Sequence, residues 1–172
     1  MAAGDDAMRE AVARYMEWVY EVSVVGNGVP AEEWEAPLFT YLLTLKQFNE
    51  LKLICSRAGW PPPVDRGITF FPHVLKHILT ARGGKDSLTW QECARVLTAA
   101  LNPRSTVALQ KDHDQQVVVL NSVDVLRVGR KQEKYRGMLI VEVSIDDLAP
   151  VTAYHASEAK SRAIMKTWQV KQ

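Results

Sequence analysis

GMLIVEVSIDDLAPVTAYHA, residues 137–156, predicts two β-strands joined by a short turn. A run rich in β-branched residues comes first, and a polar connection with Asp146, Asp147 and Pro150 follows it. The second run ends in Thr-Ala-Tyr-His. Apolar, β-branched runs bounded by turn-forming residues are typical of a β-hairpin. We therefore expect a sheet in the C-terminal part of the chain.

The rest of the chain divides into helical and β patterns at about residue 104. Short segments rich in valine and separated by polar turns follow that point. The expected strands are Ser105–Gln110, Gln116–Asn121, Val123–Arg130, Met138–Ile145 and Val151–Tyr154. The expected helices cover 6–25, one or two segments of 31–58, 72–81, 88–101 with Ser87 as its N-cap, and 157–168. Helices followed by strands predict an α+β fold with helices packed on one face of an antiparallel sheet.

A proline-rich linker, Gly59-Trp-Pro-Pro-Pro63, interrupts the helical part. Three consecutive prolines cannot lie inside a helix or a central strand, so we expect a helical N-terminal region over 1–60 and an α+β domain over 61–172. The first region has 5 Lys/Arg against 9 Asp/Glu, and the second has 16 against 11. Only the second has the charge sign of a nucleic-acid binder. The many large apolar side chains of 1–60 predict that it packs beside the second region; the alternative is that it connects the second region to a larger parent protein or a delivery partner.

Composition narrows the class of protein. Hydrophobic residues make up 47% and charged residues 24% of the 172 residues, as in folded proteins that bury a core. No apolar run has the length of a membrane span, and the N-terminus has no signal-peptide pattern, so we expect no membrane partner and a cytoplasmic location. Cys55 and Cys93 form no metal-ligand or redox motif. We expect both to be buried thiols in a reducing compartment.

FFPHVLKHILTAR, residues 70–82, carries two histidines on one face of a predicted helix, because His73 and His77 are four residues apart. Histidine can transfer protons near neutral pH, and RNA cleavage without a metal needs a base, an acid and cations that stabilise the phosphorane. The same spacing can hold zinc, but no HExxH or Cys-x-x-Cys motif accompanies it, so we expect no metal and no cofactor. Alternatively, one of these histidines is only a polar residue at the helix edge. His113 and His155 are the other two histidines of the chain.

Basic and hydroxyl side chains complete the candidate site. The proposed phosphate-binding residues are Arg127, Arg130, Lys131, Lys134, Arg136 and Arg82. A solvated hairpin loop over 131–136 is the alternative reading of the basic cluster. Thr152 and Tyr154 are two residues apart and so lie on one face of the last strand. We expect them on the open face, with Val151 and Ala153 toward the core, although Tyr154 packing against the sheet is the simpler alternative.

Four segments together resemble the phage-borne branch of the barnase–EndoU–colicin–RelE group of nucleases, whose members occur in polymorphic toxins and in fusions with phage head-morphogenesis proteins. The matching segments are ITFFPHVLKHILTAR (68–82), LTAALNPRSTV (97–107), MLIVEVSI (138–145) and VTAYHASEAKSR (151–162). The resemblance implies that His77 or His73 is catalytic and that a basic residue of the strands stabilises the phosphate. It also implies that Thr152 and Tyr154 line the scissile bond.

The resulting hypothesis is a metal-independent endoribonuclease toxin of the cytoplasm of the producer or target cell, acting by 2′-hydroxyl transesterification. RNA is the expected partner, with tRNA among the candidate substrates, because unstacked single-stranded loops are favoured targets. The resemblance further implies a separate immunity or antitoxin protein. The alternative is a non-catalytic RNA-binding or protein-interaction module of a phage or secretion particle with the same fold.

Overall fold

The computed structural model describes residues 3–26, 35–84, 86–109 and 116–163. In chain order its elements are α1 (Ala3–Val19), the π-helical turn η1 (Tyr20–Val24), β1 (Phe39–Leu42), α2 (Leu45–Ala58), β2 (Gly67–Phe70), α3 (Pro72–Gly84), α4 (Trp90–Ala100), β3 (Thr106–Leu109), β4 (Val117–Val128), β5 (Glu133–Val143) and β6 (Leu148–Ser157). Residues 158–163 are helical as well. The rest of the predicted last helix, and His113, lie outside the described residues.

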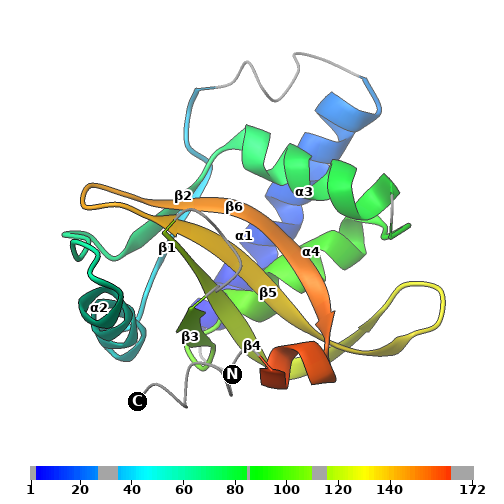
Figure 1. Ribbon diagram of the computed structural model, residues 1–172. Helices are drawn as coiled ribbons and strands as arrows, with labels where there is room; N and C mark the ends of the chain where they lie inside the picture. Colours follow the sequence, from blue (N-terminus) through cyan, green and yellow to red (C-terminus); the bar gives the residue numbers. More distant parts are fainter. Residues whose placement is uncertain (1–2, 27–34, 85, 110–115, 164–172) are drawn as a thin grey trace.

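The strands form one open sheet in the order β1-β2-β6-β5-β4-β3 (Figure 1). The predicted hairpin at 137–156 is confirmed as β5 and β6, which pair antiparallel. Neighbouring strands run antiparallel except β2 and β6, which meet in parallel at Ile68 and Leu148. The α+β class is therefore confirmed, with a mixed sheet in place of a purely antiparallel one.

Helices α1, α3 and α4 lie on one side of the sheet (Figure 1). On β5, Leu139 and Val141 belong to the main core cluster, which includes side chains of these helices. Met138 and Ile140, which alternate with them, belong to a smaller cluster on the opposite face. Because residues 137–141 of β5 are buried on both faces, this part of the strand is continuously apolar.

The N-terminal third shares the main core with the rest of the chain. Val12 and Met16 of α1 and Tyr41 of β1 lie in the same cluster as Leu139. The prediction that residues 1–60 pack beside the remainder is therefore confirmed. The helical prediction for 31–58 is wrong at Phe39–Leu42, because these residues pair with β2 and extend the sheet.

Three local predictions need correction. Gln116–Asn121 and Val123–Arg130 form one strand, β4, with an irregularity between Asn121 and Val125 in place of a turn. Glu133–Arg136 lies in β5, so the basic loop is shorter than expected. The N-cap of α4 is Thr89, whose hydroxyl accepts from Glu92 N at 3.1 Å, and Ser87 instead has a left-handed φ of 56°. These shifts follow from pairing and capping geometry that apolar spacing does not reveal.

Helix α2 connects the two ends of the sheet through Gln47. This side chain is fully buried and follows β1, yet its Nε2 donates to the carbonyl oxygens of Asn102 at 2.8 Å and Ser105 at 3.0 Å, just before β3. Its Oε1 accepts from Tyr41 Oη and from Thr44 N, both at 3.0 Å. Both N–H donors and both acceptor positions of the Gln47 side-chain amide are therefore used.

We predict that Gln47→Met lowers the free energy of unfolding by on the order of 3 kcal/mol, because the carbonyl groups of Asn102 and Ser105 and the backbone N–H of Thr44 lose their hydrogen bonds to the Gln47 amide while the volume is kept. Urea unfolding followed by circular dichroism measures this. Gln91→Met, an exposed position on α4, is the matched control and should change the value by less than about 0.5 kcal/mol. Equal effects of the two substitutions would contradict this account of the fold.

Candidate functional site

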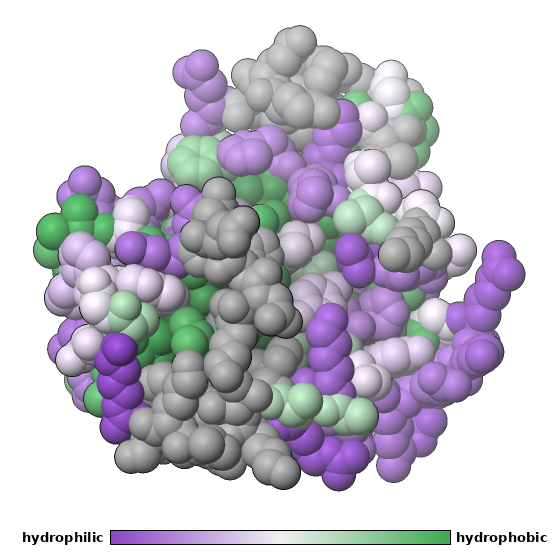
Figure 2. All heavy atoms as spheres, viewed as in Figure 1, coloured by the Kyte–Doolittle hydropathy of each residue, from purple (hydrophilic) through white to green (hydrophobic). Residues whose placement is uncertain are grey.

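A polar cleft lies between the α3–α4 connection and the β4–β5 hairpin, and its volume is about 310 Å³. We call it the His155 cleft. Its lining residues are Asp86, Ser87, Val128, Gly129, Arg130, Lys131, Tyr135 and His155. Figure 2 shows hydrophilic side chains gathered over the projecting hairpin that forms one wall. The cleft therefore combines a histidine, a phenol and cations, which are groups that can serve as base, acid and charge stabiliser.

Glu92 holds the hairpin against the start of α4. One carboxylate oxygen accepts from Thr89 N at 3.1 Å, and the other accepts from Gly129 N at 2.8 Å. Burial raises the pKa of Glu92, but the backbone hydrogen bonds from Thr89 and Gly129 lower it. Their combined effect exceeds that of burial, so the net shift of the pKa is downward. Gly129 has a φ of 81°, a conformation that favours glycine. The position of the basic turn is thus set by one charged side chain.

The place of His155 depends on Gly137, its cross-strand neighbour. A Cβ atom at Gly137 would collide with the carbonyl oxygen of Val96 in α4, so only glycine allows β5 to approach the helix this closely. The imidazole of His155 contacts the ring of Tyr135 edge-on, with ring centroids 4.7 Å apart. The Tyr135 hydroxyl donates to Glu133 Oε2 at 3.2 Å. A histidine and a tyrosine therefore sit side by side in the cleft.

Burial lowers the pKa of His155 below its ordinary value, and the positive charge of Arg82 lowers it further, while Asp86 acts in the opposite direction. The imidazole is therefore neutral at neutral pH. Its Nδ1 atom is buried and has no hydrogen-bond partner in the described part of the chain. Buried polar atoms nearly always have partners, so such an atom marks a candidate functional group. A neutral imidazole can accept a proton from a substrate only at a nitrogen that the substrate reaches, and Nδ1 is not one, since it is buried.

Arg82, a predicted phosphate-binding residue, lies next to this histidine. Its guanidinium pairs with Asp86 at 2.7 Å, and the two side chains are only 21% and 23% exposed. The charge of Arg82 acts on the pKa values of both Tyr154 and His155. Asp86 lines the cleft, and its carboxylate already partly neutralises the charge of Arg82.

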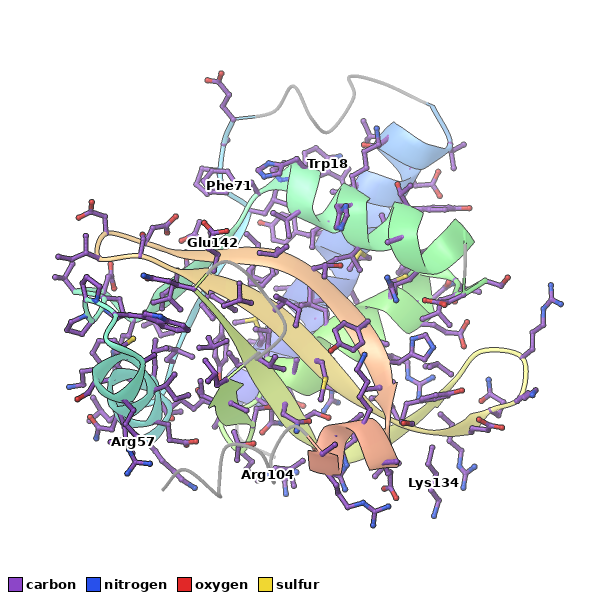
Figure 3. The ribbon with its side chains drawn as sticks, in the orientation of Figure 1. Trp18, Arg57, Phe71, Arg104, Lys134 and Glu142 are labelled. Atoms are coloured by element: carbon purple, nitrogen blue, oxygen red, sulfur yellow. The ribbon has the colours of Figure 1, made fainter. Side chains whose placement is uncertain are left out.

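The predicted basic cluster is divided between two faces of the hairpin. Arg130 and Lys131 line the His155 cleft and are exposed. Arg127 pairs in register with Lys134, next to the Leu126–Tyr135 pair. Strand alternation places Arg127 and Lys134 on the face opposite Tyr135, and Figure 3 shows Lys134 extending away from the hairpin.

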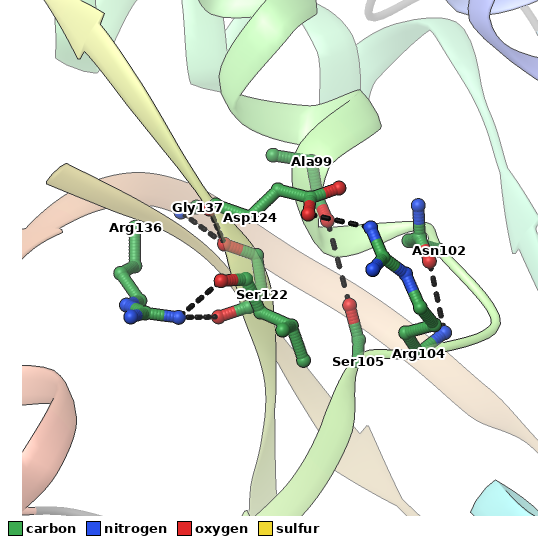
Figure 4. A network of polar contacts seen from close by, with 9 residues as sticks. Ala99, Asn102, Arg104, Ser105, Ser122, Asp124, Arg136 and Gly137 are labelled. Atoms are coloured by element: carbon green, nitrogen blue, oxygen red, sulfur yellow. Dashed lines mark hydrogen bonds and ion pairs between the residues drawn. The ribbon is translucent and has the colours of Figure 1, made fainter.

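Arg136 is occupied by contacts on that opposite face. Its guanidinium donates to the carbonyl oxygen of Ser122 at 3.3 Å and to that of Val123 (Figure 4). It also forms an ion pair with Glu158 at 3.6 Å. These contacts hold the irregular part of β4 against β5. Arg136 therefore has a structural role in addition to the phosphate contact predicted for it.

His73 and His77 share one face of α3, as predicted, and both are exposed. Val74 and Ile78 lie on the buried side of the same helix. The ring of His73 stacks on Phe71 with centroids 5.9 Å apart. Figure 3 shows Phe71 just before α3. Neither histidine lines the His155 cleft. The structure thus keeps the histidine pair separate from the basic turn.

Thr152 and Tyr154 share a face of β6, as predicted, because they pair with Ile140 and Met138 of the smaller cluster. Burial raises the pKa of Tyr154, and Lys160 Nζ lies 4.7 Å from the centre of its ring. Thr152 Oγ1 is buried without a hydrogen-bond partner in the described residues. This face is opposite the one that carries His155.

One expectation about this strand is wrong. Val151 does not face the core; it is 39% exposed, because the register between β5 and β6 shifts next to it. Ala153 is buried in the main core as expected. A bulge of this kind cannot be read from alternation alone.

Three ionisable residues of the cleft were not among the predicted site residues, namely His155, Tyr135 and Asp86. His155 directly follows Tyr154 in the Thr-Ala-Tyr-His segment, so alternation alone assigns it to the other face. The register that brings Tyr135 and Gly137 beside it has no sequence signal of its own. Within the described ranges, no three His, Cys, Asp or Glu side chains group as metal ligands, and no helix there is long and apolar enough to cross a bilayer.

A scan against protein-family models, a search of curated proteins and a search of solved structures found no match to this chain.

We predict that the stability of the protein falls as the pH drops through the ordinary histidine range, about pH 6.5, toward the lowered pKa of His155. The unfolded chain takes up this proton at a higher pH than the folded chain, so protonation favours unfolding. Urea unfolding between about pH 7.5 and 5 should show a shallower decline for His155→Gln than for the wild type. His77→Gln, on the exposed face of α3, is the control; parallel curves for wild type and His155→Gln would refute the prediction.

Proposed function

We propose that this chain is a metal-independent endoribonuclease in which His155 is the general base. The observation that carries the proposal is the imidazole of His155, which lines a polar cleft beside the Tyr135 phenol and two exposed cations, Arg130 and Lys131. The lowered pKa of His155 supports the role, because a base must be unprotonated at the pH of the reaction. The proposal moves the catalytic histidine from α3 to β6.

In this reaction His155 takes the proton from a ribose 2′-hydroxyl, and the 2′-oxygen forms a bond to phosphorus. The bond from phosphorus to the 5′-oxygen of the next nucleotide breaks, and that oxygen receives a proton. Tyr135 is the candidate donor, because its phenol is in the cleft next to the imidazole; its hydroxyl turns from Glu133 to the leaving oxygen in this step. The products are a 2′,3′-cyclic phosphate and a free 5′-hydroxyl. Arg130 and Lys131 offset the charge that builds up on the phosphorane.

RNA is the proposed substrate class because the nucleophile belongs to ribose. An unstacked strand, such as a tRNA loop, gives the backbone access to a cleft of this size. The free, buried Cys55 and Cys93 support action in a reducing cytoplasm, in the producer or a target cell. A toxin role held in check by an immunity protein is part of the proposal through the family resemblance.

The second candidate is an RNA-binding protein that does not cut. It is favoured by the separation of the histidines of α3, the Thr152–Tyr154 face and the His155 cleft, since a chemical step needs its groups together. RNA binding without cleavage by the wild-type chain would select it.

We predict that the wild-type chain cleaves labelled single-stranded RNA in EDTA and that His155→Ala lowers the rate at least a hundredfold, the usual size of a general-base contribution. Gel analysis of the products measures this. A single 2′-deoxy nucleotide at the cleaved position should block the reaction. His73→Gln and His77→Gln are the matched controls and should keep near wild-type rates. Uncut RNA in the wild-type sample, or full activity in His155→Ala, would overturn the proposed mechanism.

We also predict how binding depends on salt. In a His155→Gln background, Arg130→Ala with Lys131→Ala should weaken RNA binding and reduce the slope of log affinity against log salt by about 1.4, since each phosphate contact on a single strand contributes about 0.7. Fluorescence anisotropy at several salt concentrations measures the slope. Lys134→Ala is the control on the opposite face of the hairpin and should leave the slope nearly unchanged. If Lys134→Ala reduced the salt slope and the Arg130→Ala, Lys131→Ala double substitution did not, the RNA path would lie on the face of the hairpin that carries Lys134.

A further inference from the structure

A second cavity, separate from the His155 cleft, lies between α1, α4 and the β4 segment 124–126, and its volume is about 510 Å³. No residue lines both. Its lining residues are Arg9, Ala13, Trp90, Gln91, Ala94, Arg95, Thr98, Ala99, Asn102, Asp124, Val125 and Leu126. Figure 4 shows Ala99, Asn102 and Asp124 at the end of α4. This volume is in the range typical of small-molecule sites.

The interior of the cavity is apolar and is made by small side chains. Ala13 of α1 and Ala94 and Ala99 of α4 leave space where the two helices and β4 meet. Trp90 and Leu126 add apolar surface to the lining. A single turn of helix, about 10 Å across and 5.4 Å long, would already take most of this volume. The shape therefore suits a small apolar molecule better than a helix of a partner.

The charge available at the rim is positive. Arg95 is exposed and makes no hydrogen bond or ion pair with any residue in the described ranges. The nearby Glu92 carboxylate is already used by Thr89 N and Gly129 N. Asp124, the acid of the cavity lining, pairs with Arg104 at 2.5 Å. Arg95 still interacts electrostatically with Glu92. An anionic group at the mouth of the cavity would nevertheless meet a guanidinium that makes no hydrogen bond or ion pair within the described ranges.

We propose that this cavity binds a small organic acid with an apolar body, the chemistry of a medium-chain fatty acid, with its carboxylate on Arg95 and its hydrocarbon chain among the alanines. The inference is independent of RNA cleavage, because it uses none of the residues of the His155 cleft. A guanidinium can hold a carboxylate through two parallel hydrogen bonds, which gives the site its preference for an acid over an alcohol. The hydrocarbon supplies affinity by leaving water.

Isothermal titration of the full chain with decanoate and with decan-1-ol tests the proposal. We expect one decanoate per chain, with weaker binding of the alcohol. Arg95→Gln should weaken decanoate about tenfold, as loss of a charge-assisted hydrogen bond predicts, and leave the alcohol unchanged. Arg14→Gln, an exposed arginine of α1 outside the cavity, is the matched control and should have no effect.

Ala13→Leu tests the location, because its larger side chain fills the cavity and should abolish binding of both compounds. If Ala13→Leu does not keep the wild-type circular dichroism spectrum, and so does not fold normally, Thr98→Leu on α4 is used as the cavity-filling variant in its place. Absence of decanoate binding, or equal binding of acid and alcohol, overturns the proposal. The proposal is also overturned if Arg95→Gln weakens decanoate binding no more than Arg14→Gln does, or if Ala13→Leu leaves decanoate binding unchanged.

Discussion

Gln47 satisfies four hydrogen bonds from a position with no exposure to water, and the arrangement of the molecule depends on them. The sheet is open, so its end strands β1 and β3 do not pair with each other. Helix α2 follows β1 in the chain, and the Gln47 amide attaches it to the backbone just ahead of β3. A buried amide is costly unless all of its hydrogen bonds are made, so this contact admits one relative position of the two ends.

The same contact anchors the end of α4, because Asn102 and Ser105 follow that helix. Two further contacts position α4, one at its first turn and one at its middle. Its first turn is tied to the β4–β5 hairpin through Glu92, and its middle lies against β5 where Gly137 has no side chain. The position of the basic turn relative to His155 is therefore a consequence of helix packing. The proposed acid-binding cavity lies along another side of α4, which makes this helix the common support of both candidate sites.

β6 separates two sets of polar groups that are adjacent in the sequence. Tyr154 faces the smaller cluster with Met138, whereas His155 faces the cleft with Tyr135. Arg82 influences the pKa of both residues from the end of α3. A sequence segment that resembles one site is thus distributed over two surfaces, and the exposed cations Arg130 and Lys131 line the cleft on the side of His155.

The α+β class, the β5–β6 hairpin and the helical position of the histidine pair were predictable, because they depend on local periodicity and on turn residues. The same local rules placed Thr152 and Tyr154 on one face. They failed at β1, whose four residues become a strand only because β2 is beside them, and at Val151, where a register shift overrides alternation. Apolar pattern and charge determined by themselves that this chain forms a helix-covered sheet with a basic C-terminal part. Only the tertiary structure decided which histidine meets the basic turn, because that depends on cross-strand register and on the close approach of Gly137 to α4, which are contacts between residues far apart in the chain.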